Sequence, residues 1–78
     1  MLKHYNFDPN IREVICMNIK KYRKEKNVRL MDLAEAVDVS PDYIRRMESK
    51  TGIKNISLTT LYKISVVLDV GIEKFLEK

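Results

Sequence analysis

Two adjacent arginines, Arg45 and Arg46, have the clearest binding chemistry in the sequence and lie in the segment VSPDYIRRMES, residues 39–49. A guanidinium group can donate two hydrogen bonds to O6 and N7 of guanine, or pair with a phosphate. Ser40 and Pro41 form a helix start signal, because serine caps helix N-termini and proline suits the first helical position. Two interpretations stand: a helix that reads DNA, or an amphipathic helix whose charges face water.

Few other side chains offer reactive chemistry. The single cysteine, Cys16, lies in a helical pattern with no histidine nearby, which favours burial over a nucleophilic role. One cysteine cannot form an internal disulfide, and one histidine, His4, provides no set of zinc ligands. The sequence therefore predicts no enzyme, no bound metal and no cofactor, and it indicates no small-molecule substrate.

Length and charge set the class of protein. The chain has 78 residues, enough for one domain, and such a domain buries only about 60% of its unfolded surface. Residues 12–29 carry seven basic and two acidic side chains, and residues 40–54 carry four basic and two acidic ones. These two stretches suit a polyanion if folding brings them together, whereas the net charge of +4 alone favours an ordinary solvated surface.

The cytoplasm is the expected location. The sequence contains no apolar run that approaches the roughly 20 residues of a membrane span. Its first residues, with Asp8 and Pro9, lack the basic start and apolar stretch of a signal peptide. We therefore expect a soluble protein that makes no membrane contact.

Apolar residues recur at steps of three and four, which predicts five short helices and an all-α fold. The positions are Ile11, Ile15, Ile19 and Tyr22; Leu30, Leu33, Ala34 and Val37; Ile44 and Met47; Leu58, Leu61, Ile64 and Leu68; and Ile72, Phe75 and Leu76. Residues 1–10 are interpreted as a mobile N-terminal arm and residues 11–78 as one compact helical domain.

Polar residues at the ends of these patterns predict helix starts and turns. Asp8 before Pro9 predicts a first helix start, and Ser57 predicts another. The expected chain reversals, which tolerate left-handed backbone, are Asn27, Asp38 and Gly52.

The link between the second and third helices is very short. Only Asp38 and Val39 separate Val37, the last core position of one helix, from the cap residue Ser40 of the next. The two helices must therefore cross steeply through a tight turn, which is helix-turn-helix geometry, with Val39 filling the angle between them.

These blocks together resemble the Cro and repressor type (XRE-like) helix-turn-helix family of bacterial and phage transcription regulators. The resemblance runs from about Ile15 to Leu76, and its most specific parts are DLAEAVDVS, IRRME and SLTTLYKI. It implies a lambda-repressor-like bundle of five helices whose third helix enters the major groove of double-stranded DNA.

The resemblance also implies the DNA-facing residues, on a recognition helix at residues 41–48. The implied base-reading residues are Pro41, Asp42, Arg45 and Arg46. We expect Arg46 to read a base edge and Arg45 to contact phosphate or a flanking base. A solvated helix face remains the alternative for both arginines.

Contacts to the DNA backbone are expected around this helix. The residues are Arg29, Ser40, Tyr43, Lys50 and Lys54. Tyr43 has two equal interpretations, a hydrogen bond to phosphate or packing over the turn. Lys50 and Lys54 belong to a loop about two residues longer than is common in the family, and a mobile loop is the alternative there.

The family pairs an arginine of the first helix with an acid at the end of the third, and Arg23 and Glu48 occupy these positions. We interpret them as a structural ion pair. Removing one side would leave the other charge uncompensated, so folding is expected to suffer before binding does.

Two departures from the family pattern affect the prediction. Arg29 and Leu30 replace a small polar cap and a glutamine that contacts the DNA backbone, and neither can supply those hydrogen bonds. Asp42 places an acid at the leading end of the recognition helix, where it repels phosphate and suits only a cytosine amino group. Together they predict altered specificity or a protein-binding module.

The last third of the chain is the expected dimer interface. Its apolar residues Tyr62, Val66, Ile72 and Phe75 match a region that commonly forms a two-fold interface in the family. A homodimer would place two recognition helices about 34 Å apart on a palindromic operator. Burial in the monomer core is the competing interpretation.

The leading prediction is a sequence-specific DNA-binding regulator, and the alternative is a protein-interaction module of the same fold, such as an antitoxin-like or anti-regulator partner.

Overall fold

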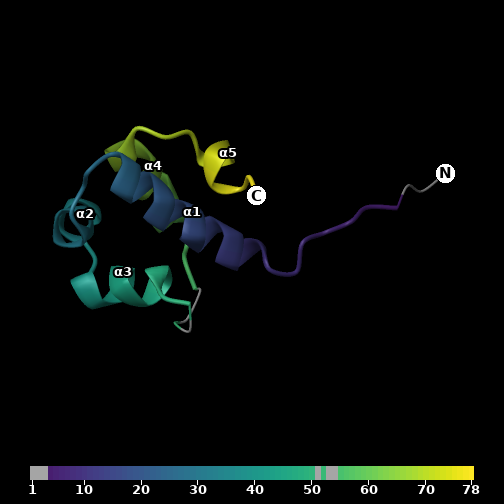
Figure 1. Ribbon diagram of the computed structural model, residues 1–78, viewed down its shortest axis with the longest axis horizontal. Helices are drawn as coiled ribbons and strands as arrows, with labels where there is room; N and C mark the ends of the chain where they lie inside the picture. Colours follow the sequence, from purple (N-terminus) through teal and green to yellow (C-terminus); the bar gives the residue numbers. More distant parts are fainter. Residues whose placement is uncertain (1–3, 51, 53–54) are drawn as a thin grey trace.

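The computed structural model describes residues 4–50, 52 and 55–78. Within this part of the chain there are five helices and no strand (Figure 1). The helices are α1 (Ile11–Glu25), α2 (Leu30–Val37), α3 (Pro41–Glu48), α4 (Leu58–Leu68) and α5 (Ile72–Phe75). The predicted all-α class and the order of the helices are confirmed.

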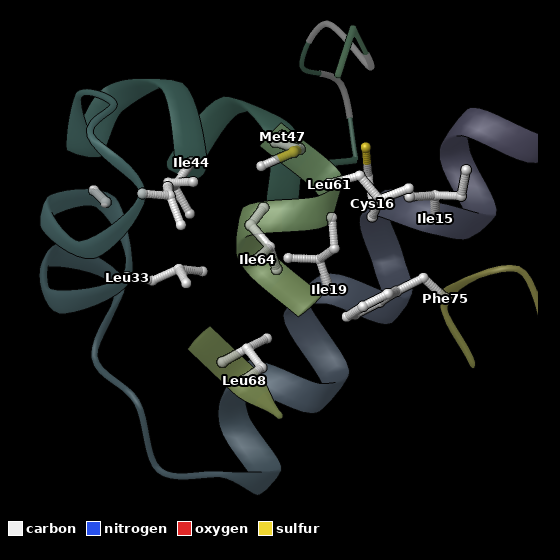
Figure 2. Close-up of a cluster of buried hydrophobic side chains, with 12 residues drawn as sticks. Ile15, Cys16, Ile19, Leu33, Ile44, Met47, Leu61, Ile64, Leu68 and Phe75 are labelled. Carbon is white, nitrogen blue, oxygen red and sulfur yellow. The ribbon is translucent and has the colours of Figure 1, made fainter. Parts of the chain in front are cut away.

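A single apolar core joins the helices. Helix α1 packs against α3, α4 and α5, and α2 packs against α3 and α4. Figure 2 shows the core side chains converging from these elements, with Ile19 of α1 and Ile64 of α4 near its centre. The buried apolar residues are Ile15, Cys16, Ile19, Leu33, Ala34, Val37, Ile44, Met47, Leu61, Ile64, Leu68 and Phe75. Cys16 is fully buried, as predicted.

Three helices end with the same two-residue device, an Asn or Asp in left-handed backbone followed by a valine. The pairs are Asn27 and Val28, Asp38 and Val39, and Asp69 and Val70. Each valine N–H returns to a carbonyl of the last helical turn at 3.0 to 3.1 Å, and each valine side chain packs against the core. The sequence prediction missed Asp69, although its DV dipeptide repeats the one at residues 38–39.

Two of the three predicted caps are present. Ser40 Oγ accepts a hydrogen bond from Tyr43 N at 3.1 Å, with Pro41 at the first helical position, and Ser57 Oγ accepts one from Thr60 N at 3.1 Å. The serine oxygen thereby satisfies one backbone N–H that the helix itself leaves unpaired.

The predicted start of the first helix is wrong. Helix α1 begins at Ile11, and Asn10 occupies the cap position. The Asp8 carboxylate accepts from Asn10 N at 2.8 Å in a turn before the helix, so Pro9 belongs to this turn. An Asx-type turn has here taken the place of a cap, because an aspartate can bond the backbone two residues on.

Gly52 is required for a different reason from the one predicted. Its φ is not positive, so left-handed backbone is not its role. A Cβ atom at this position would overlap the carbonyl oxygen of Arg46 in the last turn of α3. The chain therefore approaches α3 more closely here than any residue with a side chain allows.

The C-terminal residue, Lys78, meets the base of the N-terminal arm near the start of α1. Residues 4–10 extend away from the helices in Figure 1, and Asp8 at the base of this arm forms an ion pair with Lys78 at 3.0 Å. The hydrogen bond from Asn10 and the bond to Lys78 lower the pKa of Asp8. Residues 1–3 of the predicted arm lie outside the described residues. None of the described helices is long and apolar enough to cross a bilayer.

Candidate nucleic-acid interface

Helices α2 and α3 form the predicted tight pair. Asp38 adopts φ 60° and ψ 50° immediately after α2, which reverses the chain. Val39 is half-buried against the core in the angle between the helices, and α3 begins two residues later. Because both helices are anchored by buried side chains on either side of this turn, their crossing is set by packing.

Helix α3 has a buried face and an exposed face. Ile44, Met47 and Glu48 are no more than 5% exposed and point into the protein. The side chains of Asp42, Arg45 and Arg46 are 56%, 64% and 65% exposed. The predicted base-reading charges therefore share one solvent-facing side of a helix that lies along an edge of the molecule in Figure 1.

Asp42 contacts both arginines, a relationship that the sequence prediction did not include. Its Oδ1 accepts from Arg45 Nη1 at 3.1 Å, and its Oδ2 lies 2.9 Å from Arg46 Nε. The spacings of three and four residues along the helix bring these groups together. Pro41, the fourth predicted base-reading residue, lies half-buried at the start of the same helix.

Arg23 and Glu48 form the predicted ion pair, which anchors the far end of α3 to α1. Arg23 Nε donates to Glu48 Oε2 at 2.6 Å and Nη2 donates to Oε1 at 2.8 Å. Arg23 Nη1 also donates to the carbonyl of Val28 at 2.9 Å, which ties in the loop before α2. The hydrogen bonds to Glu48 raise the pKa of Arg23 against the opposing effect of its burial.

Tyr43 packs against the core, one of its two predicted alternatives. Its hydroxyl donates to the carbonyl of Asn55 at 2.9 Å. Burial, followed by an electrostatic contribution from Cys16, raises the pKa of Tyr43. The hydroxyl has one proton to donate, so a bond to phosphate would require it to leave Asn55.

The remaining predicted backbone contacts surround the start and the end of α3. Ser40 Oγ is engaged as a cap, and Lys50 is exposed just after the helix. Arg29 is exposed and pairs through Nε and Nη2 with Asp32 at 2.8 and 3.3 Å, which raises its pKa. Lys54 lies outside the described residues.

Leu30 has a structural role at the position where the family carries a DNA-contacting glutamine. It is half-buried and packs against the core. With Pro41 it lines an open groove of about 410 Å³ between the starts of α2 and α3. The departure at Leu30 therefore places an apolar side chain against the core and in this groove.

Arg12 is a basic residue near α3 that motif reasoning missed. Its Nη1 donates to Asn55 Oδ1 at 3.4 Å, and Asn55 also receives the Tyr43 hydroxyl. The start of α1 is thereby joined to the segment that follows α3. The excess of basic residues at positions 12–29 was a signal for Arg12, but no motif marked it.

The predicted dimer residues divide between surface and core. Tyr62 and Val66 are 58% and 60% exposed on α4, and Ile72 is half-buried. Phe75 is fully buried and meets the Tyr22 ring edge-on at 5.6 Å, so its assignment to an interface is corrected to the monomer core, as Figure 2 shows. Leu58, which belongs to the apolar pattern that predicted this helix, is 75% exposed on the same side of α4.

The chain is similar in sequence to known helix-turn-helix proteins. A family model described as Helix-turn-helix matches residues 19–75, which include the whole α2–α3 pair. The HTH-type transcriptional regulator SinR of Bacillus subtilis is 38% identical over 65 residues, or 83% of this chain. The chain spans 58% of the length of that relative.

Two solved structures share the fold. The crystal structure of SinR, described as the master regulator for biofilm formation, in complex with DNA has a TM-score of 0.72 and 40% identity. The match covers 81% of this chain and 98% of that one. A complex of SinR with the SinI protein has a TM-score of 0.72 and 39% identity, over 82% of this chain and 61% of the other.

Proposed function

Because this chain belongs to the helix-turn-helix family, we propose that it is a sequence-specific DNA-binding transcriptional regulator whose α3 enters the major groove. One observation carries the proposal: Arg45 and Arg46 share the exposed face of α3, while its opposite face is held by the core and by the Arg23–Glu48 pair. A rigid helix that presents two guanidinium groups is suited to base edges. The proposal includes no catalytic role and no cofactor.

The contact at Asp42 supports different roles for the two arginines. Arg46 approaches the carboxylate through Nε, the inner nitrogen, which leaves its terminal nitrogens for an end-on contact with guanine O6 and N7. Arg45 uses a terminal nitrogen, so we assign it to a phosphate or a flanking base. Pro41 offers an apolar contact at the leading end of the helix. We assign backbone contacts to Arg29, Ser40, Lys50 and Lys54.

Selection of duplexes from a random library, followed by affinity measurements at two salt concentrations, tests the proposal. Specific binding predicts a steep loss of affinity with salt, because phosphate contacts release counterions. Arg46→Ala is expected to lose about 1 to 3 kcal/mol of discrimination at one base pair. Lys50→Ala is expected to weaken all sequences alike and to reduce the salt slope by about 1. Absence of binding at low salt would refute the proposal.

A homodimer on a palindromic operator is the second part of the proposal. Leu58, Tyr62 and Val66 recur at four-residue steps, so they form one exposed apolar face of α4. We propose this face as the two-fold interface, in place of the predicted set that included Phe75. Sedimentation at micromolar concentration is expected to show a dimer for the natural chain and a monomer for Val66→Lys. A strict monomer in both would contradict it.

The alternative function is a protein-interaction module of the same fold. The exposed apolar face of α4 favours it, as does the solved complex of the similar protein SinR with SinI. The DNA-binding experiment separates the two functions, since this alternative predicts no measurable affinity for any duplex.

A further inference from the structure

Asp42 occupies a position between the two arginines that no DNA-reading role of its own explains. Each of its carboxylate oxygens faces a different guanidinium group, Oδ1 at 3.1 Å from Arg45 Nη1 and Oδ2 at 2.9 Å from Arg46 Nε. From this geometry we infer that Asp42 is a positioning residue that directs Arg46 to a guanine edge and restrains Arg46 from phosphate. The inference rests on the proposed DNA-binding function and goes beyond it by naming what sets specificity.

The nitrogen that Asp42 contacts decides which target Arg46 can reach. The Arg46 nitrogen nearest to Asp42 is Nε, so the two terminal nitrogens remain at the tip of the side chain, and these are the donors that a guanine edge accepts. Arg46 can therefore keep its contact with Asp42 while it reads a base. Reading a base and pairing with Asp42 are compatible.

A phosphate contact is not compatible in the same way. If Arg46 turned sideways to a phosphate, Asp42 would lose one of its two arginine partners or would follow Arg46 toward a second negative charge. Both outcomes disfavour the phosphate-bound arrangement, whereas the base-reading arrangement retains the ion pair. The carboxylate therefore lowers non-specific affinity more than specific affinity, which is how specificity is increased by repulsion.

The strength of these contacts fits a positioning role. The three side chains are more than half exposed, and exposed ion pairs contribute little to stability. The pairs therefore add little to folding, but they restrict the rotamers of two long side chains before binding. Side chains that are already restricted lose less conformational entropy when they bind DNA.

The Arg29–Asp32 pair on α2 provides a contrast within the same protein. It also spans three residues, but Arg29 contacts its single acid through both Nε and Nη2, at 2.8 and 3.3 Å. Two nitrogens of the Arg29 guanidinium group are therefore engaged by Asp32. Asp42 instead contacts two arginines, each through one carboxylate oxygen. It therefore restricts both side chains while each arginine keeps its other nitrogens for DNA.

Affinity measurements on Asp42→Asn test the inference. The duplexes are one selected by the natural chain, its single base-pair variants and a random duplex. We expect the ratio of specific to random affinity to fall about ten-fold, mainly because binding to the random duplex tightens. Asp42→Asn should lose discrimination between bases at the same base pair as Arg46→Ala does. In a protein that already carries Arg46→Ala, adding Asp42→Asn should cause no further loss of discrimination at that base pair.

Two controls separate positioning from net charge and from folding. Glu77→Gln makes the same charge change at an exposed residue outside α3 and is expected to leave the ratio unchanged. Asp42→Ser removes the charge but keeps a residue suited to a helix start, so it carries the test if Asp42→Asn melts earlier. Both Asp42 variants are expected to lose discrimination at the same base pair.

The outcomes distinguish this inference from the proposed function. If the natural chain binds no duplex, the proposed function and the inference both fail. If the natural chain binds specifically and the folded Asp42 variants keep the same ratio of specific to random affinity, only the inference about Asp42 is overturned. An equal fall in Glu77→Gln would also overturn it, because net charge would then explain the effect.

Discussion

Arg23 and Glu48 are joined by two hydrogen bonds at 2.6 and 2.8 Å, and their residues are only 9% and 5% exposed. Removal of one partner leaves a shielded charge without compensation. Arg23→Ala is therefore expected to lower the free energy of unfolding by about 3 kcal/mol. Thermal and urea unfolding followed by circular dichroism would measure the loss.

Arg29→Ala is the matched control for that prediction, because its pair with Asp32 is exposed. An exposed ion pair contributes about 1 kcal/mol at most, so the melting temperature should change little. An unchanged melting temperature in Arg23→Ala would contradict the structural role of the buried pair.

Ser40 supplies the only side-chain acceptor seen at the start of α3 within the described residues. Ser40→Ala is expected to destabilise the protein by about 1 kcal/mol, because the N–H of Tyr43 loses its partner. Asn10→Ala provides the comparison, since the described structure shows no side-chain cap bond from Asn10 to α1. Equal losses in urea unfolding for the two variants would count against the cap.

Asn18 secures the C-terminal segment to α1. Its Nδ2 donates to the carbonyls of Phe75 and Glu77 at 2.8 and 2.6 Å. Asn18→Ala is expected to cost about 1 to 2 kcal/mol and to speed hydrogen exchange at the α5 amide of Lys74. Amides of α3 should keep their protection relative to global unfolding, and uniform acceleration across the protein would contradict a local role.

Tyr43→Phe separates packing from phosphate binding. Loss of the bond to Asn55 should cost about 1 kcal/mol of stability at neutral pH. If Tyr43 only packs, DNA affinity stays unchanged once folding is accounted for. A uniform fall in affinity for all duplexes would instead support the phosphate contact.

Alkaline titration gives a further measurement on Tyr43. Burial raises its folded-state pKa above the ordinary value of about 10, so the neutral phenol is favoured in the fold. The resulting stability is fully present below pH 10 or so and is lost as pH rises through the folded-state pKa. The difference in unfolding free energy between the natural chain and Tyr43→Phe should therefore shrink in that window, and a constant difference would contradict it.

Local sequence was sufficient for the helices and most of their ends. Apolar spacing identifies each helix, serine oxygens at Ser40 and Ser57 cap two of them, and Asn27 and Asp38 adopt left-handed backbone as predicted. These features depend on a few neighbouring residues, so type and spacing determine them. Asp69 also adopts left-handed backbone after a helix, so the same local rule would have predicted it.

Tertiary packing alone decided which apolar side chains are buried and which polar groups meet. Leu58 and Phe75 both fit a helical apolar pattern, yet Leu58 is 75% exposed and Phe75 is fully buried, because only Phe75 faces another helix. Arg12 meets Asn55 across 43 positions of sequence, a contact that no local pattern encodes. The Asp42 contact is local, but its division between two arginines depends on side-chain geometry that residue spacing alone leaves open.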